Sequence, residues 1–221
     1  MLKFKKQNWL KLGLELFVVF LGITAGFLLN NWQIDRQEAK IEQKYLEGFS
    51  EDVNSNISEL EAAIQRDTTW IVKANKIIKI INDGGLPIDS TNAAISLISN
   101  LNTLEISAST YDDIINSGNL NLIRSFHLKS QIIKHQNVIA SSELLDEYLK
   151  KFFNNFLLPF LVAETNVMTI EFNNPETIKS VRLTNLIGIY FSFINQRTVV
   201  YKKFLEESYK LSEELETVLN L

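Results

Sequence analysis

The hydrophobic pattern of the chain is dominated by an apolar run near the amino terminus. Residues 12–29 read LGLELFVVFLGITAGFLL and contain a single charge, Glu15. At about 1.5 Å per residue, a helix of this length nearly crosses a hydrocarbon core of about 30 Å, and the next three residues complete the crossing. The pattern therefore predicts a transmembrane helix over residues 12–32.

Aromatic and basic residues flank this segment as they flank many membrane spans. Trp9 precedes the run and Trp32 ends it, and indole rings prefer the water interface on either side of a bilayer. The tail, residues 1–11, contains four lysines and no acid, whereas residues 33–44 contain three basic and three acidic residues. The unopposed lysines favour a cytoplasmic amino terminus, which places residues 33–221 on the other side of the membrane.

Two other kinds of segment produce a similar pattern. A cleaved export signal also begins with a basic stretch and an apolar run, but this run is longer than usual and no A-x-A-like cleavage site follows it. A buried helix of a soluble protein would carry a polar face, which the run lacks. The membrane helix accounts for the pattern better than either alternative.

Glu15 is the one charge in the predicted span, and it has two interpretations. A charge in lipid is costly unless it is partnered, so Glu15 could face a helix bundle or an ion path. The simpler interpretation places it in the first turn inside the membrane, where it reaches the interface and pairs with Lys11. The sequence favours the simpler interpretation.

The span also contains a small-residue pattern. Gly22 and Gly26 have the spacing through which membrane helices approach one another closely. We therefore expect self-association of the span, and the candidate residues are Glu15, Gly22, Gly26, Asn30 and Asn31.

Beyond the span, apolar residues recur at helical intervals and predict that the membrane helix continues as a long stalk. Their positions are Ile34, Ile41, Tyr45, Phe49, Val53, Ile57, Leu60 and Ile64, and then Trp70, Ile71, Ala74, Ile77, Ile78 and Ile81. The polar residues between them are interpreted as a solvated face. Whether residues 65–69 kink the helix is left open, and a stop is predicted at residues 83–87, which contain two glycines and a proline.

The remaining pattern predicts further helices. A short one starts near Ser90 or Thr91, and another of about two turns starts at Ser109, whose spacing to Asp112 is that of a capping box, and ends at Gly118. A longer helix is predicted to start at Ser125, and a further helix start is predicted at Asn174-Pro175. The final segment, roughly residues 183–219, is predicted to form one long amphipathic helix. The apolar stretch 152–162 is too short for a second span and contains Pro159, so it is interpreted as a core or interface element.

Together these elements predict an all-α protein. Its parts are a cytoplasmic basic tail (residues 1–11), a transmembrane helix (12–32) and an extracytoplasmic helical domain (33–221). Four or five helices with apolar stripes can bury them by packing antiparallel into a bundle.

Charge and composition exclude several functions. The chain has a net charge of −4, so it lacks the basic excess that a nucleic-acid partner requires. It has no cysteine, and its two histidines, His127 and His135, lack the spacing of a zinc pair. Adjacent Asp112 and Asp113 are explained by the helix dipole. No phosphate loop or nucleophile elbow occurs, so we expect no cofactor, no metal and no enzyme activity.

Two segments resemble an uncharacterised bacterial family of small single-pass membrane proteins. The first is Glu15-Leu16 followed by VVFLGITAGFLLNNW, and the second is TYDDIINSGNLNLI at residues 110–123. The family shows a closing INNW, where this chain has Leu29 in place of isoleucine. The resemblance implies a bacterial inner (cytoplasmic) membrane location with a periplasmic domain, and it transfers no mechanism. Its motif residues Tyr111, Ser117, Gly118 and Asn119 are expected to be structural.

Three functions remain open at this level. The first is a non-enzymatic, membrane-anchored module that acts through protein contact, as a homo-oligomer or an accessory subunit of an envelope complex. The second is an extracytoplasmic bundle that senses a ligand. The third is an oligomeric channel or transporter subunit that uses Glu15. The expected partners are membrane lipid and either another protein or a second copy of the chain.

Overall fold

The computed structural model describes residues 7–83, 91–99, 101–166 and 168–220, and nearly all of them are helical. The elements are, in order, α1 (Gln7–Asn82), α2 (Thr91–Ile98), α3 (Ser109–Asn116), η2 (Asn119–Leu122), α4 (Phe126–Phe152), the π-helical turn η3 (Phe153–Leu157), α5 (Leu158–Glu164), β1 (Thr165–Asn166), β2 (Glu171–Phe172), η4 (Pro175–Lys179) and α6 (Val181–Leu219). The prediction of an all-α chain is confirmed. The two-residue strands, which pair antiparallel, were not predicted.

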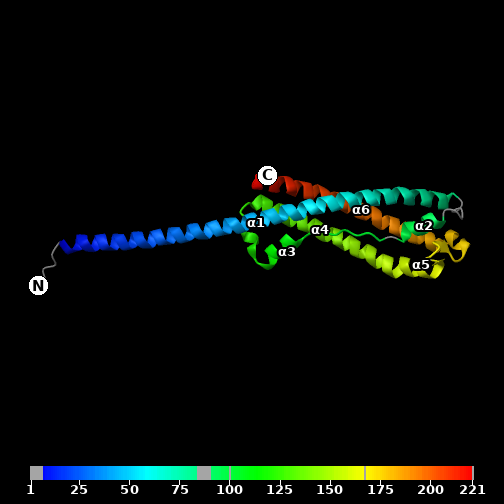
Figure 1. Cartoon of the computed structure of the whole chain (residues 1–221), viewed down its shortest axis with the longest axis horizontal. Coiled ribbons are helices and arrows are strands. Elements are labelled where there is room, and N and C mark those ends of the chain that lie inside the picture. Colours follow the sequence, from blue (N-terminus) through cyan, green and yellow to red (C-terminus); the bar gives the residue numbers. More distant parts are fainter. Residues whose placement is uncertain (1–6, 84–90, 100, 167, 221) are drawn as a thin grey trace.

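Helix α1 is a single helix of 76 residues. It continues without a break through residues 65–69, the stretch that the sequence left undecided, and it ends at Asn82. Its amino-terminal part contains an 18-residue window with a mean hydropathy of 2.2, none of which is buried, so this part is a candidate membrane span. Figure 1 shows that this part extends alone, well away from the rest of the molecule.

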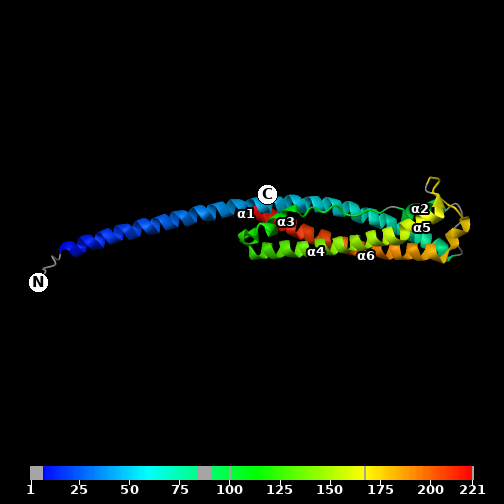
Figure 2. The same ribbon diagram turned by 90° about the horizontal axis from the view of Figure 1, so that it is seen from below.

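The second part of α1 packs with α4 and α6 into a three-helix bundle (Figures 1 and 2). The prediction of antiparallel packing is confirmed for α6, which runs against both other helices. It is wrong for α1 and α4, which point in the same direction (Figure 1). The reason is that α2 and the segment after it lead the chain back along the bundle before α3 and α4 begin (Figure 2).

This return segment, residues 101–108, is not helical, and side chains from the bundle satisfy its backbone. Asn56 donates to the carbonyl oxygen of Ser107 and accepts from its amide, both at 2.8 Å. Asp146 accepts from the amide of Leu104 at 3.2 Å. A partly buried extended backbone needs such partners because it has no helical hydrogen bonds of its own.

The buried side chains of the described residues form three clusters along the bundle axis. The predicted stripe of α1 supplies Phe49 and Val53 to the cluster near the candidate span and Leu60 to the central one. Ile34 and Ile41, the first two positions of the stripe, are exposed. The bundle therefore begins near residue 45, and residues 33–44 form a stalk segment between the candidate span and the bundle.

Several helix starts are capped as predicted. The Ser125 hydroxyl accepts from the amide of Leu128, and the Asn174 side chain accepts from that of Glu176. At α3 the prediction was wrong, because Ala108 is the N-cap and its side chain makes no capping bond. Instead, Asp52 on α1 accepts from the amide of Thr110 at 2.9 Å, so the cap comes from another helix.

The apolar stretch 152–162 is partly a core element, as predicted. Phe152, Leu157 and Phe160 are buried against α6 and α2 at the end of the bundle that lies far from the candidate span. Pro159 follows the π-helical turn, and it has no amide hydrogen to give to a carbonyl one turn earlier. Among the described residues, only α1 is long and apolar enough to cross a membrane.

Candidate functional site

The predicted association residues of the span lie on an exposed helix. A β-carbon added at Gly22 or Gly26 would meet no atom within 4 Å. At 100° per residue, Glu15, Gly22 and Gly26 share one face of α1. Asn30 lies at the edge of this face, whereas Asn31 points about 100° away from Asn30. The helix thus brings four of the five candidates together and leaves Asn31 apart.

The surroundings of the span correspond in part to the sequence expectations. Trp9 and Trp32 are both exposed, and they are separated by roughly 35 Å of helix. The guanidinium of Arg36 lies 5.4 Å from the ring centre of Trp32. The structure contains no ion pair between Lys11 and Glu15, although both residues are described, so the simple pairing of Glu15 is not present.

Residues 110–123, the second segment on which the predicted family resemblance rests, make contacts with α1. The Tyr45 hydroxyl lies 3.0 Å from the Ser117 hydroxyl, and the Asn119 amide donates to it at 3.0 Å. Gly118 has a φ of 73°, the left-handed conformation that the sequence predicts there. The Tyr111 ring packs against the cluster near the candidate span. These contacts are those of a structural motif.

Asp52 on α1 binds the residues at the start of α3. Its carboxylate accepts from the hydroxyls of Ser107 and Ser109 as well as from the Thr110 amide. Burial raises the pKa of Asp52, but these hydrogen bonds outweigh it and hold the pKa below its ordinary value. Next to this site, a β-carbon on Gly48 would lie 2.8 Å from Oγ1 of Thr110, so the close approach of α3 requires a glycine.

A buried ionic cluster lies inside the bundle, farther from the candidate span. Arg197 on α6 donates from Nε to Asp67 of α1 at 3.0 Å, and from Nη1 to Asp146 of α4 at 3.4 Å. It also donates to the carbonyl oxygen of Asn102 in the return segment. The Tyr201 hydroxyl donates to Asp146 at 2.7 Å. All three helices and the return segment therefore meet at one guanidinium.

Burial and neighbouring charges shift the pKa values of Arg197, Asp67 and Tyr201 in this cluster. Burial lowers the pKa of Arg197, but the hydrogen bond and charge of Asp67 outweigh it and raise the pKa above its ordinary value. Burial raises the pKa of Asp67, and the bonds from Arg197 oppose that shift only in part. Burial and the charge of Asp146 also raise the pKa of Tyr201, although Arg197 opposes them. Arg197 therefore stays protonated and is the cation of the cluster.

The sequence interpretation missed this cluster because it assigned the polar residues of α1 to a solvated face. The signal was present in the pattern. Asp67 lies three residues after Ile64 and three before Trp70, and Arg197 lies between Ile194 and Tyr201 at the same kind of spacing. A charge that interrupts an apolar stripe is buried with its neighbours and needs a partner.

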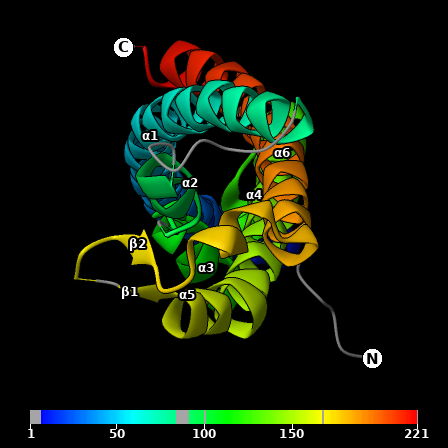
Figure 3. The same cartoon turned by 90° about the vertical axis from the view of Figure 1, so that its right-hand side faces the viewer.

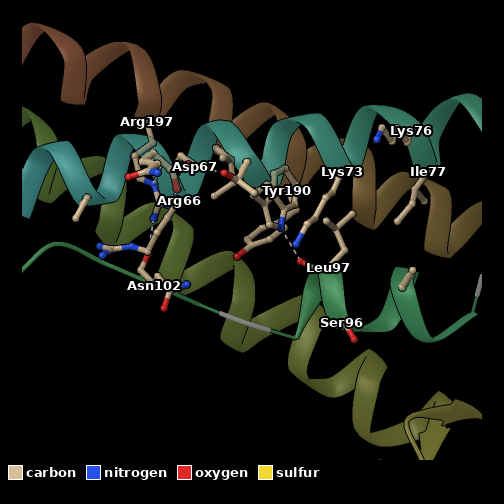
Figure 4. Close-up of a pocket in the computed structure, with 16 residues that line it drawn as sticks. Arg66, Asp67, Lys73, Lys76, Ile77, Ser96, Leu97, Asn102, Tyr190 and Arg197 are labelled. Carbon is tan, nitrogen blue, oxygen red and sulfur yellow. Dashed lines mark hydrogen bonds and ion pairs between the residues drawn. The ribbon is translucent and has the colours of Figure 1, made fainter.

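A cleft of about 900 Å³ opens beside the cluster, between α1, α2 and α6. Its apolar wall includes Trp70, whose ring meets the Tyr190 ring edge-on at 5.1 Å and whose Nε1 donates to the carbonyl oxygen of Leu97 at 2.8 Å. Figure 4 shows Asp67 and Arg197 at one end of the cleft. The end view in Figure 3 places α2 beside α1 at the end of the bundle far from the span. The volume suits a small organic ligand.

The two histidines lie in different surroundings. His127 is exposed, and its Nδ1 lies 2.6 Å from Glu214. His135 is buried, its Nε2 lies 3.0 Å from the Ser208 hydroxyl, and its ring packs against Phe204. Burial lowers the pKa of His135 to about 4, although the charges of Glu207 and Asp52 oppose the shift. This residue is therefore a neutral packing residue near pH 7.

Within the described ranges, no group of three or more His, Cys, Asp or Glu residues is arranged to hold a metal ion. Comparison of the chain with models of protein families, with curated proteins and with solved structures found no match. The site therefore has to be interpreted from its own geometry, which offers an apolar cleft with charged groups on its rim.

Proposed function

We propose that the chain is a membrane-anchored binding protein whose ligand occupies the cleft between α1, α2 and α6. Of the three functions that the sequence leaves open, ligand binding is the one that this cleft favours. The observation that carries the proposal is the continuity of α1, which extends from the exposed apolar window to the wall of the cleft. One helix thus joins the candidate anchor to the candidate binding site.

The proposed location follows from the basic tail and the resemblance to the bacterial family. Residues 12–32 cross the cytoplasmic membrane with the amino terminus inside, and the bundle lies in the periplasm. The cleft is lined by α1 residues 62–77, which lie about 30 to 45 residues beyond Trp32. At 1.5 Å per residue, that separation is roughly 45 to 65 Å. The cleft therefore receives its ligand from the aqueous phase.

A second candidate is non-enzymatic contact with another protein or a second copy. It is favoured by the open face of Glu15, Gly22 and Gly26, to which no other described residue is packed. A span that carries such a face is suited to pair with another membrane helix. The channel interpretation would use the same face and would need several copies, because one helix encloses no pore.

Native mass determination of the full chain in lipid nanodiscs tests these functions against one another. We expect a small-molecule mass on the wild-type protein that is lost in Ala93→Phe, because Ala93 is exposed and lines the cleft. The matched control is Ala140→Phe, which alters an exposed alanine on α4 and should retain the mass. A stoichiometric protein partner, or a homo-oligomer without any small molecule, would contradict ligand binding and favour contact.

A further inference from the structure

The rim of the cleft carries more positive charge than the structure neutralises. Its lining includes four cations, Arg66, Lys73, Lys76 and Arg197, and one carboxylate, Asp67. Arg197 is paired with two buried carboxylates, and Arg66 is paired with Glu59 at 3.0 Å. Neither lysine forms an ion pair with any residue that the structure describes. The uncompensated charge of the cleft is therefore positive.

The two lysines are placed differently around the opening. In Figure 4 the side chain of Lys73 extends from α1 toward Leu97 on α2, next to the Tyr190 ring. The side chain of Lys76 points away from α2 in the same view. Lys73 is thus the unpaired cation that faces the space between the walls. An amine in this position can donate to an anionic group that enters the cleft.

The lining of the cleft next to Lys73 includes aromatic and aliphatic side chains. The Trp70 ring is fixed by its hydrogen bond to Leu97 and by the edge-on contact with Tyr190. Ile77 and Ile194 add aliphatic surface to the same lining. A flat or aliphatic body on this wall would bury apolar surface without ordering these side chains further, and such preorganisation favours binding.

We propose that the cleft binds an amphipathic organic anion, with its acidic group on Lys73 and its apolar body against Trp70. This assignment rests on the proposed binding function and names the class of ligand. A cation would meet four lysine and arginine side chains in the lining, of which Lys73 and Lys76 are unpaired. A polar ligand without an apolar body would leave the aromatic wall unused. A free carboxylate or sulfonate of moderate size meets both requirements.

The tryptophans of the chain give a direct assay of this proposal. Trp9 and Trp32 flank the span, so the double variant Trp9→Phe, Trp32→Phe leaves Trp70 as the sole tryptophan. The full-length protein in nanodiscs is titrated with 9-anthracenecarboxylate, whose ring accepts energy from tryptophan. The neutral 9-anthracenemethanol is the matched probe, and empty nanodiscs measure partition into lipid.

We expect saturable quenching of Trp70 by the carboxylate, with a Kd at least about tenfold lower than that of the alcohol. Lys73→Gln should raise the Kd of the carboxylate about tenfold and leave that of the alcohol unchanged. Lys79→Gln removes the same charge from an exposed position on α1 outside the cleft and should change neither value.

The outcomes separate the two proposals. Equal affinity for the carboxylate and the alcohol, or equal effects of Lys73→Gln and Lys79→Gln, would overturn the anionic class while the cleft remains a ligand site. Absence of saturable quenching by both probes would overturn ligand binding at Trp70 itself, and the proposed function would fail with it.

Discussion

Replacing Arg197 with alanine is expected to lower the free energy of unfolding of the bundle by about 3–5 kcal/mol. The substitution leaves Asp67 and Asp146 buried without their cation, and both carboxylates are at least nine-tenths buried. It also removes the donor to the Asn102 carbonyl oxygen, so the return segment loses one of its attachments. Urea unfolding of the full chain in detergent, followed by circular dichroism, measures the change.

Two further variants show whether the cost comes from the unpaired carboxylates. Arg182→Ala alters an exposed arginine of the same helix, which lies over the Phe160 ring, and should cost less than about 1 kcal/mol. The double variant Asp67→Leu, Arg197→Met removes one carboxylate together with the cation. It should therefore lose less free energy of unfolding than Arg197→Ala. Equal effects of Arg197→Ala and Arg182→Ala would contradict the cluster as the centre of the bundle.

Lowering the pH from 7.5 to 4.5 is expected to destabilise the bundle by about 2–3 kcal/mol through His135 alone. The folded pKa of His135 is about 4, below the ordinary value of 6.5. The unfolded chain therefore takes up this proton first as the pH falls. The stability that His135 contributes is complete above pH 6.5 and is lost as the pH falls from 6.5 toward 4.

Carboxylates also titrate in this range, so the prediction is measured as a difference between variants. His135→Gln keeps a group that can bond to Ser208 but cannot become charged, and it should lose less stability at pH 4.5 than the wild type. His127→Gln, at an exposed histidine beside Glu214, is the matched surface control. Parallel pH profiles for His135→Gln and the wild type would show that His135 is not kept neutral by burial.

The sequence predicts those parts of the structure that depend on local periodicity and capping. The apolar stripe of α1 supplies buried residues to the core from Phe49 onward, and Ser125 and Gly118 cap and end their helices as expected. These features were predictable because the signal and the structure lie within a few residues of each other. The candidate span is recognised for the same reason, since its apolar window is continuous.

The missed features all depend on contacts between distant residues. Ser109 has the spacing of a capping box, yet Asp52 satisfies the start of α3 from a position 58 residues earlier. The parallel course of α1 and α4 depends on the return segment, which Asn56 and Asp146 stabilise in a non-helical form. Periodicity cannot reveal such pairings, although a polar residue within an apolar stripe indicates where to search.

The candidate site was beyond prediction for the same reason. Its lining comes from α1, α2 and α6, which are separated by up to about 130 residues, as the pair of Asp67 and Arg197 shows. Trp70 was assigned to a helical stripe, which is correct, but nothing in the sequence places it opposite Tyr190. The positive rim is also hidden by the net charge of −4 of the whole chain.

The central claim, a helix that crosses the membrane and continues into a periplasmic cleft, is tested most directly by cysteine labelling. The chain has no cysteine, so Asn8→Cys in the basic tail and Ser55→Cys on an exposed position of α1 each introduce a single thiol. A membrane-impermeant maleimide should label position 55 in intact spheroplasts and position 8 only after the membrane is opened. Labelling of position 8 alone in intact spheroplasts, or recovery of the protein in the soluble fraction, would contradict the account.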